Sequence, residues 1–289
     1  MSIDKESKGW ASGLLGVLIF SGSLPATRVA VATFDPVFLT FARAAIAGVL
    51  AAMILLVLRQ PRPERSDMRA LLVVALGVVI GFPLLTALAL RHVSAAHAIV
   101  FVGLLPMATV IFSVLRGDKN PSWLFWLFSL SGSLVVAVFA MREGIQVSAT
   151  GDLLMLIAVI VCGLGYAEGA RLARHLGGWQ VICWALVLSL PLMLPLSLWT
   201  LPGNFLQAAW PALLSLGYVS LFSMLLGFFF WYRGLALGGI ASISQLQLLQ
   251  PFFGLGLAAA LLGEHVSMIM IASALAVALC VVGARRFAL

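Results

Sequence analysis

The sequence predicts an all-α integral membrane protein with ten transmembrane helices, arranged as two inverted five-helix repeats. The chain of 289 residues is 63% hydrophobic and only 9% charged, whereas soluble domains are about 45–50% apolar and about 25% charged. Its apolar segments are continuous and about 20 residues long, which fits helices across a bilayer core of ~30 Å rather than barrel strands. Pro106 and Pro251 interrupt two of these segments 145 residues apart (251 − 106), half the chain length.

Ten apolar segments follow one another along the chain. They cover residues 10–31, 36–58, 70–90, 94–115, 122–141, 151–170, 178–200, 210–235, 240–262 and 265–282. The first follows a polar N-terminal stretch and has no small-residue cleavage site, so we expect a spanning helix and not a removed signal peptide. The later segments are separated by short loops with Pro, Gly or charged residues, such as "RQPRPERSDMR", "RGDKNPS", "RLARHLGG" and "GG".

Four of these segments contain residues that bend a helix or let helices approach closely. Pro106 lies in the fourth segment and Pro251 in the ninth, and a proline inside a helix removes a backbone donor and bends the chain. Gly81 lies in the third segment and Gly227 in the eighth, where glycine permits close helix contact. We therefore predict that Gly81, Pro106, Gly227 and Pro251 act as hinges.

The matching places of the two prolines predict a repeat at residues 1–144 and a second one at 145–289. An odd number of helices in each repeat forces the two copies into opposite orientations, which is the arrangement of many secondary transporters. Two inverted halves can exchange outward-open and inward-open conformations. The substrate cavity then lies between them near the membrane midplane, and transport proceeds by alternating access.

The basic residues are distributed unequally between the two sides of this topology. Arg28, Arg91 and Arg142 fall on one side, and Arg43 lies within a span. The other side holds both termini and thirteen basic residues: Lys5, Lys8, Arg59, Arg62, Arg65, Arg69, Arg116, Lys119, Arg171, Arg174, Arg233, Arg285 and Arg286. Because basic loops stay in the cytoplasm, both termini are predicted to be cytoplasmic. The net charge of +7 then reflects topology, and no nucleic-acid partner is expected.

Several stretches resemble the EamA-type transporters of the drug/metabolite transporter superfamily. They are "PVFLTFARAAIAG", "ALALRHVSAAHAIVFVGLLPMATVIFSVLRGD", "GDLLMLIAVIVCGLGYAEGARLAR" and "RGLALGGIASISQLQLLQPFFGLGLAAALLGE". In the last stretch Pro251 and Glu264 match the family's proline and helix-end acid, and Asp118 takes the place of that acid in the first half, offset by one residue. The resemblance covers essentially the whole chain and is closest to the YddG-type exporters of aromatic amino acids. It implies a carrier in the bacterial inner membrane that exports amino acids and related metabolites.

Polar residues inside the spans are the candidate substrate ligands, because lipid makes them costly. In the fourth segment His97 shares one helix face with Ser94 and Phe101. That face could offer a hydrogen bond and an aromatic surface to a ligand. The alternative is that His97 forms a hydrogen bond between two helices.

The ninth segment reads "SISQLQLLQP" and contains three further candidates, Ser244, Gln245 and Gln247. An amide can donate to a carboxylate and accept from an ammonium group, and a zwitterionic amino acid requires both. The alternative is hydrogen bonding between helices, which is worth ~0.6–2 kcal/mol per contact in membranes.

Phe82, Tyr166 and Arg43 complete the candidate substrate site. The two rings could stack on an aromatic substrate, although a packing role is the alternative for each. Arg43 lies seven residues beyond Pro36, ~10 Å along its helix. It could bind a carboxylate or extend to the interface. Because Leu186 stands at the corresponding place in the second half, a purely structural role for Arg43 stays open.

The scarcity of acidic residues in the spans bears on energy coupling. Apart from Glu168, we expect no Asp or Glu inside a helix, and proton-driven carriers often use a buried carboxylate. His97 is the deepest group expected to titrate near neutral pH. The sequence therefore favours transport down the substrate gradient or weak proton coupling.

Other functional classes lack their sequence signatures. The chain has no HExxH, GxSxG or CxxC motif, which argues against an intramembrane enzyme, and no sign of the oligomer symmetry of a channel. Cys162, Cys183 and Cys280 lie in apolar segments at irregular spacing, so no disulfide framework is expected. We expect no cofactor and no metal, and a monomer whose partners are the bilayer and a small-molecule substrate. A multidrug or other metabolite carrier of the same fold is the main alternative.

Overall fold

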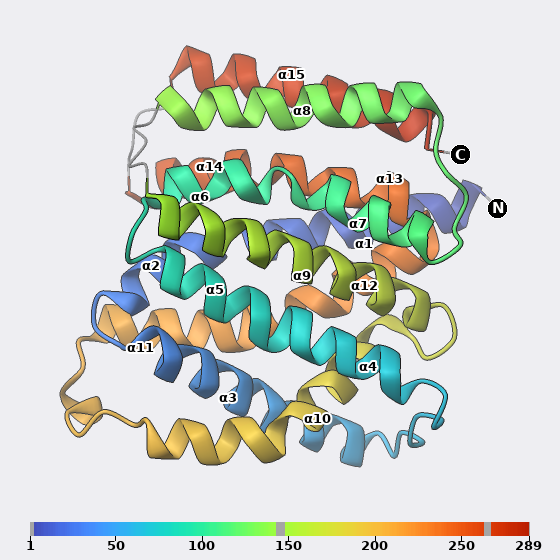
Figure 1. Ribbon diagram of the computed structural model, residues 1–289. Helices are drawn as coiled ribbons and strands as arrows, with labels where there is room; N and C mark the ends of the chain where they lie inside the picture. The colour runs from blue at the N-terminus through green and yellow to red at the C-terminus, as the bar shows by residue number, and fades with distance from the viewer. Residues whose placement is uncertain (1–2, 143–147, 263–266, 289) are drawn as a thin grey trace.

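The computed structural model describes residues 3–142, 148–262 and 267–288, and within those ranges it contains helices and connections without a β-strand. The helices lie side by side along one common direction, with both chain termini at the same end of the bundle (Figure 1). Nine helical stretches in the described ranges are long and apolar enough to cross a membrane. The all-helical membrane fold expected from composition is confirmed for this part of the chain. The expected boundary between residues 144 and 145, Glu264 and His265 lie outside the described residues.

The first half of the chain contributes five of the nine candidate spans. Several of them consist of shorter helices joined end to end. In order they are α1 (Ile3–Ser21) and α2 (Ser23–Val31); α3 (Pro36–Val57); α4 (Met68–Val74), the π-helix η1 (Ala75–Gly81) and α5 (Phe82–Ala89); α6 (Ala95–Val102) and α7 (Leu105–Leu115); and α8 (Trp123–Arg142). Asp35 caps the start of α3 by accepting from Val37 N, and Ser94 caps α6 by accepting from His97 N, as short polar side chains commonly do at helix N-termini.

The second half repeats this order of elements. It comprises α9 (Ala149–Ala173), α10 (Gly178–Trp199), the 3₁₀ turn η2 (Phe205–Gln207), α11 (Trp210–Tyr218), the π-helix η3 (Val219–Leu226), α12 (Gly227–Gly238), α13 (Ile240–Ser244), the 3₁₀-helix η4 (Gln245–Leu249), α14 (Gln250–Leu262) and α15 (Met268–Arg286).

The expected segment 240–262 is not the continuous helix that its apolar character suggested. It is divided into α13, η4 and α14. Pro251 lacks the N–H that would bond the carbonyl four residues earlier, and the preceding turn tightens into 3₁₀ geometry. The fourth expected segment is divided in the same way, between α6 and α7, next to Pro106.

Several element boundaries in the two halves lie 145 residues apart. α6 begins at Ala95 and α13 at Ile240, and α8 begins at Trp123 and α15 at Met268; both pairs of residues are 145 apart (240 − 95 and 268 − 123). The two π-helices agree with this spacing. At the end of η1, Phe82 N donates to Gly77 O, and at the end of η3, Gly227 N donates to Phe222 O. These bonds are also 145 residues apart (227 − 82 and 222 − 77).

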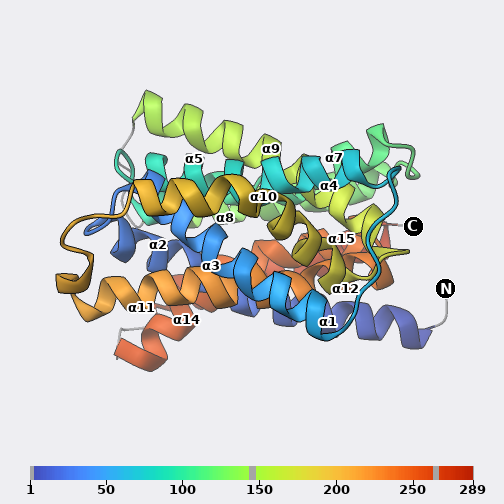
Figure 2. The same cartoon turned by 90° about the horizontal axis from the view of Figure 1, so that it is seen from below.

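Packing between the halves brings corresponding helices together. α3 packs against α10 and α8 against α15, while α1 packs against α12 and α9 against α5 and η1. α3 and α10 lie side by side when the bundle is seen from below as well (Figure 2). The contact of α1 with α12 is close at two glycine pairs, since a Cβ added to Gly234 would meet Gly13 Cα at 2.7 Å and a Cβ added to Gly9 would meet Gly238 N at 2.5 Å. Trp231 and Tyr232, both fully buried, lie at the centre of the core.

Candidate functional site

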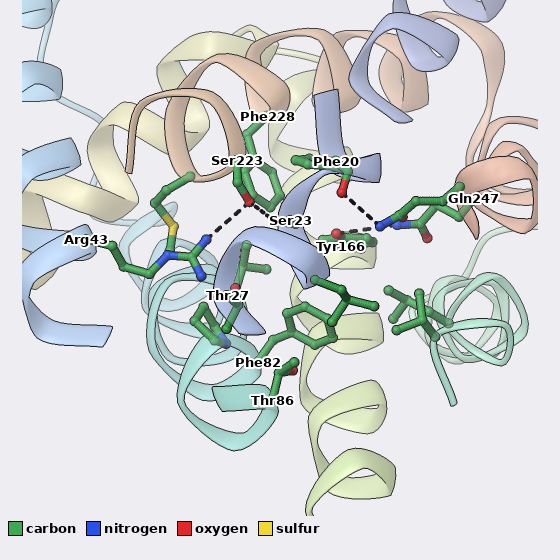
Figure 3. Close-up of a pocket in the computed structure, with 17 residues that line it drawn as sticks. Phe20, Ser23, Thr27, Arg43, Phe82, Thr86, Tyr166, Ser223, Phe228 and Gln247 are labelled. Carbon is green, nitrogen blue, oxygen red and sulfur yellow. Dashed lines mark hydrogen bonds between the residues drawn. The ribbon is translucent and has the colours of Figure 1, made fainter. Parts of the chain in front are cut away.

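A cavity at the centre of the bundle draws side chains from both halves of the chain (Figure 3). The space within it that can hold the centre of a water molecule is about 50 Å³. The lining residues come from α1, α2, α3, η1, α5, α6, α7, α9, η3, α12, η4 and α14: Phe20, Ser23, Leu24, Thr27, Arg43, Val78, Phe82, Pro83, Thr86, Val102, Leu105, Tyr166, Ser223, Met224, Phe228, Gln247 and Gln250. Both π-helices and the 3₁₀-helix η4 therefore border the cavity, in agreement with the frequent occurrence of π-segments at functional sites.

An aromatic cluster forms one wall of the cavity. The rings of Phe20 and Phe228 have centroids 4.9 Å apart, and the Tyr166 ring lies 5.9 Å from Phe228. Behind them Tyr166 contacts Trp231 at 5.6 Å and Tyr232 at 6.4 Å in tilted and edge-on geometries. Such contacts favour a well-ordered wall, which presents flat apolar faces to whatever occupies the cavity.

Arg43 is the charged residue among the residues that line the cavity, and it is 6% exposed. Its Nη2 donates to Ser223 Oγ at 3.2 Å, and Ser223 is also hydrogen-bonded to Ser23. In the described part of the chain Arg43 has no ion pair, and its Nε has no hydrogen-bond partner. A buried guanidinium group without an anion is costly, so this arrangement is suited to an anionic ligand.

A second group of polar side chains lies on the far side of the cavity from Arg43 (Figure 3). Gln247 Nε2 donates to the Tyr166 hydroxyl at 3.5 Å, and Gln250 Nε2 donates to Phe20 O at 3.1 Å. Gln247 Oε1 and Thr86 Oγ1 are both buried and have no partner among the described residues. Leaving such atoms unpaired costs about 1–3 kcal/mol each, and both residues face the same cavity as the unpaired Arg43 Nε.

The structure brings four of the predicted substrate residues together, since Arg43, Phe82, Tyr166 and Gln247 all line the cavity. It places Ser244 and Gln245 outside the lining, fully buried in the packing around the broken ninth segment.

His97 and Phe101 also lie outside the cavity lining. His97 Nε2 is 2.6 Å from Asp152 Oδ1 in the first turn of α9, and its ring packs on Phe101 with centroids 5.6 Å apart. The expectation that Glu168 is the sole acidic residue inside a span was therefore wrong. The expected segment 151–170 already contained Asp152, and the structure places it in the first turn of α9, after the Ser148 cap that accepts from Gly151 N at 3.3 Å.

The four predicted hinge residues lie where helices change geometry. Gly81 is the last residue of η1 and Gly227 directly follows η3, while Pro106 and Pro251 are each the second residue of a helix that restarts after a break. Sequence reasoning missed the hydroxyl residues of the cavity: Ser23, Thr27, Thr86 and Ser223. Isolated Ser and Thr are common in membrane helices, where they bond their own backbone, so nothing in their spacing distinguished them.

A basic pocket at the end with the termini was a second candidate. It is lined by Ala70, Arg116, Glu168, Arg171, Leu172, Arg174 and His175. Its charges are compensated, since Arg116 Nε lies 2.8 Å from Glu168 Oε1 and Arg174 lies 3.2 Å from Asp118. Burial alone would raise the pKa of Asp118, but the hydrogen bond from Ser113 and the charge of Arg174 together hold it below its usual value. The central cavity, with its unpaired polar atoms, is therefore the better candidate.

Comparison with known proteins gives a consistent assignment. The family model described as "EamA-like transporter family" matches the chain twice, at residues 7–141 and 149–285. A protein of Bacillus subtilis named "Uncharacterized transporter YdeK" is 64% identical over 286 residues, which cover 99% of this chain and 100% of the relative.

More distant similarities extend over most of the chain. A "Probable terminal-alkyne amino-acid exporter" of Streptantibioticus cattleyicolor is 25% identical over 264 residues, covering 90% of this chain and 87% of the relative. A solved structure titled "Crystal structure of protein" superposes with a TM-score of 0.75 at 18% identity and covers 98% of each chain. At that identity the superposition is evidence for the fold alone.

Proposed function

We propose a specific transport function from one premise, which is that the chain belongs to the EamA-like transporter family. It is a multi-pass membrane transporter and not an enzyme, as its family and its 64%-identical relative are transporters.

We propose that the chain has ten spans in two inverted repeats, with α13, η4 and α14 together forming the ninth. The two matches to the family model, at 7–141 and 149–285, support two copies of one unit. The recurrence of helix starts, helix breaks and π-helices at a spacing of 145 residues supports the same division. Two copies of five spans have opposite orientations, and the cavity between them is then placed for alternating access.

We propose that the substrate is an amino acid or a related small carboxylate, bound through its carboxylate by Arg43. The observation behind this proposal is the buried guanidinium group, which has no anionic partner in the described chain. A carboxylate would supply the missing charge and a partner for Nε. The hydroxyl groups of Ser23 and Ser223 lie beside the same guanidinium and could accept from the adjacent α-ammonium group.

The aromatic wall and the charge of the cavity narrow the substrate class. Phe20, Tyr166 and Phe228 offer apolar faces for an aromatic or other apolar side chain. The distant relationship to an amino-acid exporter supports this class, as does the resemblance to YddG-type exporters. A multidrug carrier for cations is less consistent, because no Asp or Glu is among the residues that line the cavity and Arg43 repels cations.

We further propose that the termini are cytoplasmic and that export across the inner membrane runs down the substrate gradient. Asp152 and Glu168, the acidic residues within α9, are paired with His97 and Arg116 away from the cavity lining. Among the described residues that line the cavity there is therefore no carboxylate at which a proton and the substrate could compete. The cavity is built from one chain, so a monomer is sufficient for this mechanism.

Counterflow in proteoliposomes tests the substrate and the role of Arg43. Liposomes loaded with unlabelled amino acids should take up labelled phenylalanine, but not phenylalaninamide, which lacks the carboxylate. Arg43→Gln should raise the KM for phenylalanine about tenfold or more, since a charge-assisted hydrogen bond contributes about 1.5–3 kcal/mol. A protonophore should leave the counterflow unchanged.

Arg28→Gln is the matched control for the charge change. The Arg28 guanidinium donates to the Leu90 carbonyl and does not line the cavity, so its loss should leave the choice of substrate unchanged. Equal transport of phenylalanine and phenylalaninamide, or an unchanged KM in Arg43→Gln, would overturn the proposal.

A further inference from the structure

The two polar groups of the cavity lie at opposite ends of an apolar space. Arg43 and Gln247 are drawn on opposite sides of the pocket, with Phe82 and Phe228 between them (Figure 3). They come from different halves of the chain, Arg43 from α3 and Gln247 from η4. A ligand that reaches both residues must therefore have polar groups at both of its ends.

The hydrogen bonds around Gln247 determine which of its atoms is free. Gln247 Nε2 donates to the Tyr166 hydroxyl at 3.5 Å. Gln247 Oε1 is then an acceptor without a donor, and Gln247 is only 2% exposed.

The geometry points to a second substrate subsite, in which Gln247 Oε1 accepts a hydrogen bond from an O–H or N–H group at the far end of the substrate. This inference rests on the proposed function, in which Arg43 holds the substrate's carboxylate. The α-ammonium group is bonded to the same carbon atom as the carboxylate, so it stays near Arg43. The group that reaches Gln247 is therefore the end of the side chain.

The preferred substrates are then α-amino carboxylates with an apolar or aromatic body that ends in a hydrogen-bond donor. Phe82 and Phe228 contact the body of the substrate, and Gln247 accepts a hydrogen bond from the donor at its end. A substrate without the donor leaves Gln247 Oε1 buried and unpaired, since no described residue donates to it. Sites built to accept a substrate hydroxyl group discriminate strongly against analogues that lack it.

Tyrosine, phenylalanine and O-methyltyrosine provide the test, because they share a carboxylate and a ring but only tyrosine has a terminal donor. In proteoliposome counterflow the wild-type protein should show a KM for tyrosine about tenfold below that for either analogue, the equivalent of about 1.4 kcal/mol. In Gln247→Met, which keeps the side-chain length without the amide, the KM for tyrosine should rise toward that for phenylalanine. The tyrosine preference should fall below about twofold, as expected when one neutral hydrogen bond is removed.

Gln180→Met is the matched control, because Gln180 lies at the start of α10, outside the cavity lining, and pairs with Gln60. It should keep the tyrosine preference. A monodisperse peak in size-exclusion chromatography in detergent shows that Gln247→Met is folded. If it does not fold, the wild-type comparison of tyrosine with O-methyltyrosine decides alone.

The outcomes separate the two proposals. Equal KM values for the three amino acids in the wild-type protein, or an unchanged tyrosine preference in Gln247→Met, would overturn the second subsite and leave the proposed function intact. Transport of none of the three would overturn the proposed function, and the subsite with it.

Discussion

Gln245 is a buried polar residue that lies outside the cavity lining and that we expect to lower the stability of the protein. It is fully buried on η4, and neither Oε1 nor Nε2 has a partner among the described residues. Replacing it by an apolar residue of similar length removes the unpaired atoms while keeping the volume. We predict that Gln245→Met raises the free energy of unfolding by about 1–3 kcal/mol and leaves transport unchanged.

Thermal unfolding in detergent, monitored by size-exclusion chromatography, measures the change, with counterflow as the functional readout. The comparison with Gln247→Met is informative because the same chemical change is made two residues apart on one 3₁₀-helix. If Gln245→Met instead loses transport, the lining of the cavity must extend to this face of η4, contrary to the structure.

The pair of His97 and Asp152 has a different role at the residue scale. It joins α6 to α9 through an Nε2–Oδ1 distance of 2.6 Å, with the His97 side chain only 8% exposed. Asp152→Ala leaves the buried imidazole without its partner, and we predict a loss of about 1–3 kcal/mol in the free energy of unfolding. Because the pair lies outside the cavity lining, the KM for substrate should stay the same.

A double-mutant cycle isolates the interaction. His97→Phe combined with Asp152→Ala should cost less than the sum of the two single changes, since each single variant already breaks the same contact. Additive losses would show that the two side chains do not interact. A raised KM with unchanged stability would instead support the ligand role expected for His97 from the sequence.

At the element scale, the positions of the spans could be predicted from the sequence but their internal geometry could not. Length and hydropathy were enough to find Pro36–Val57 and Gly178–Trp199 almost to the residue. The π-helices η1 and η3 were missed, because their sequences "ALGVVIG" and "VSLFSMLL" are ordinary apolar runs and the change to i→i−5 bonding depends on tertiary contacts. Proline marked the breaks at Pro106 and Pro251, since its missing N–H is a local property.

Gly81 is the last residue of η1 and Gly227 directly follows η3, and both have almost no room for a side chain. A Cβ on Gly81 would lie 2.6 Å from Leu76 O, and a Cβ on Gly227 would lie 2.5 Å from the Phe20 ring and 3.0 Å from Phe222 O. We predict that Gly81→Ala and Gly227→Ala each destabilise the protein by about 1–3 kcal/mol through overpacking. Both should also lower the rate of counterflow, because Phe82 and Phe228, the cavity residues that follow the two glycines, change position.

Gly217→Ala is the control for this pair, since a Cβ at Gly217 meets no atom within 4 Å. Within helix α11 the change should be neutral or should stabilise the protein by about 0.5–1 kcal/mol. Thermal unfolding and counterflow measured on the three variants test both predicted effects, on stability and on the rate of transport. Wild-type behaviour of Gly81→Ala and Gly227→Ala would mean that the π geometry is not needed for the cavity.

At the scale of the whole molecule, the sequence located part of the cavity but not its boundaries. Arg43, Phe82, Tyr166 and Gln247 were identifiable because charge, aromatic rings and amides are unusual inside a span. Which of two neighbouring glutamines faces the cavity depends on the local helix type, and which histidine is paired depends on a residue 55 positions away (152 − 97). Such information lies in the packing of the two halves and not in any one segment.

The orientation of the bundle in the membrane is the remaining whole-molecule prediction. The end with the termini holds most of the basic residues, so it should face the cytoplasm. Ser66 is exposed in the connection between α3 and α4 at this end, and Asn204 is exposed between α10 and α11 at the opposite end. In intact cells a membrane-impermeant maleimide should therefore label Asn204→Cys at once, and label Ser66→Cys only after permeabilisation. The native Cys162 and Cys183 are buried and Cys280 is partly buried within α15, so a variant with all three replaced by alanine serves as the background. The reverse labelling pattern would place the termini outside the cell and would overturn the predicted orientation.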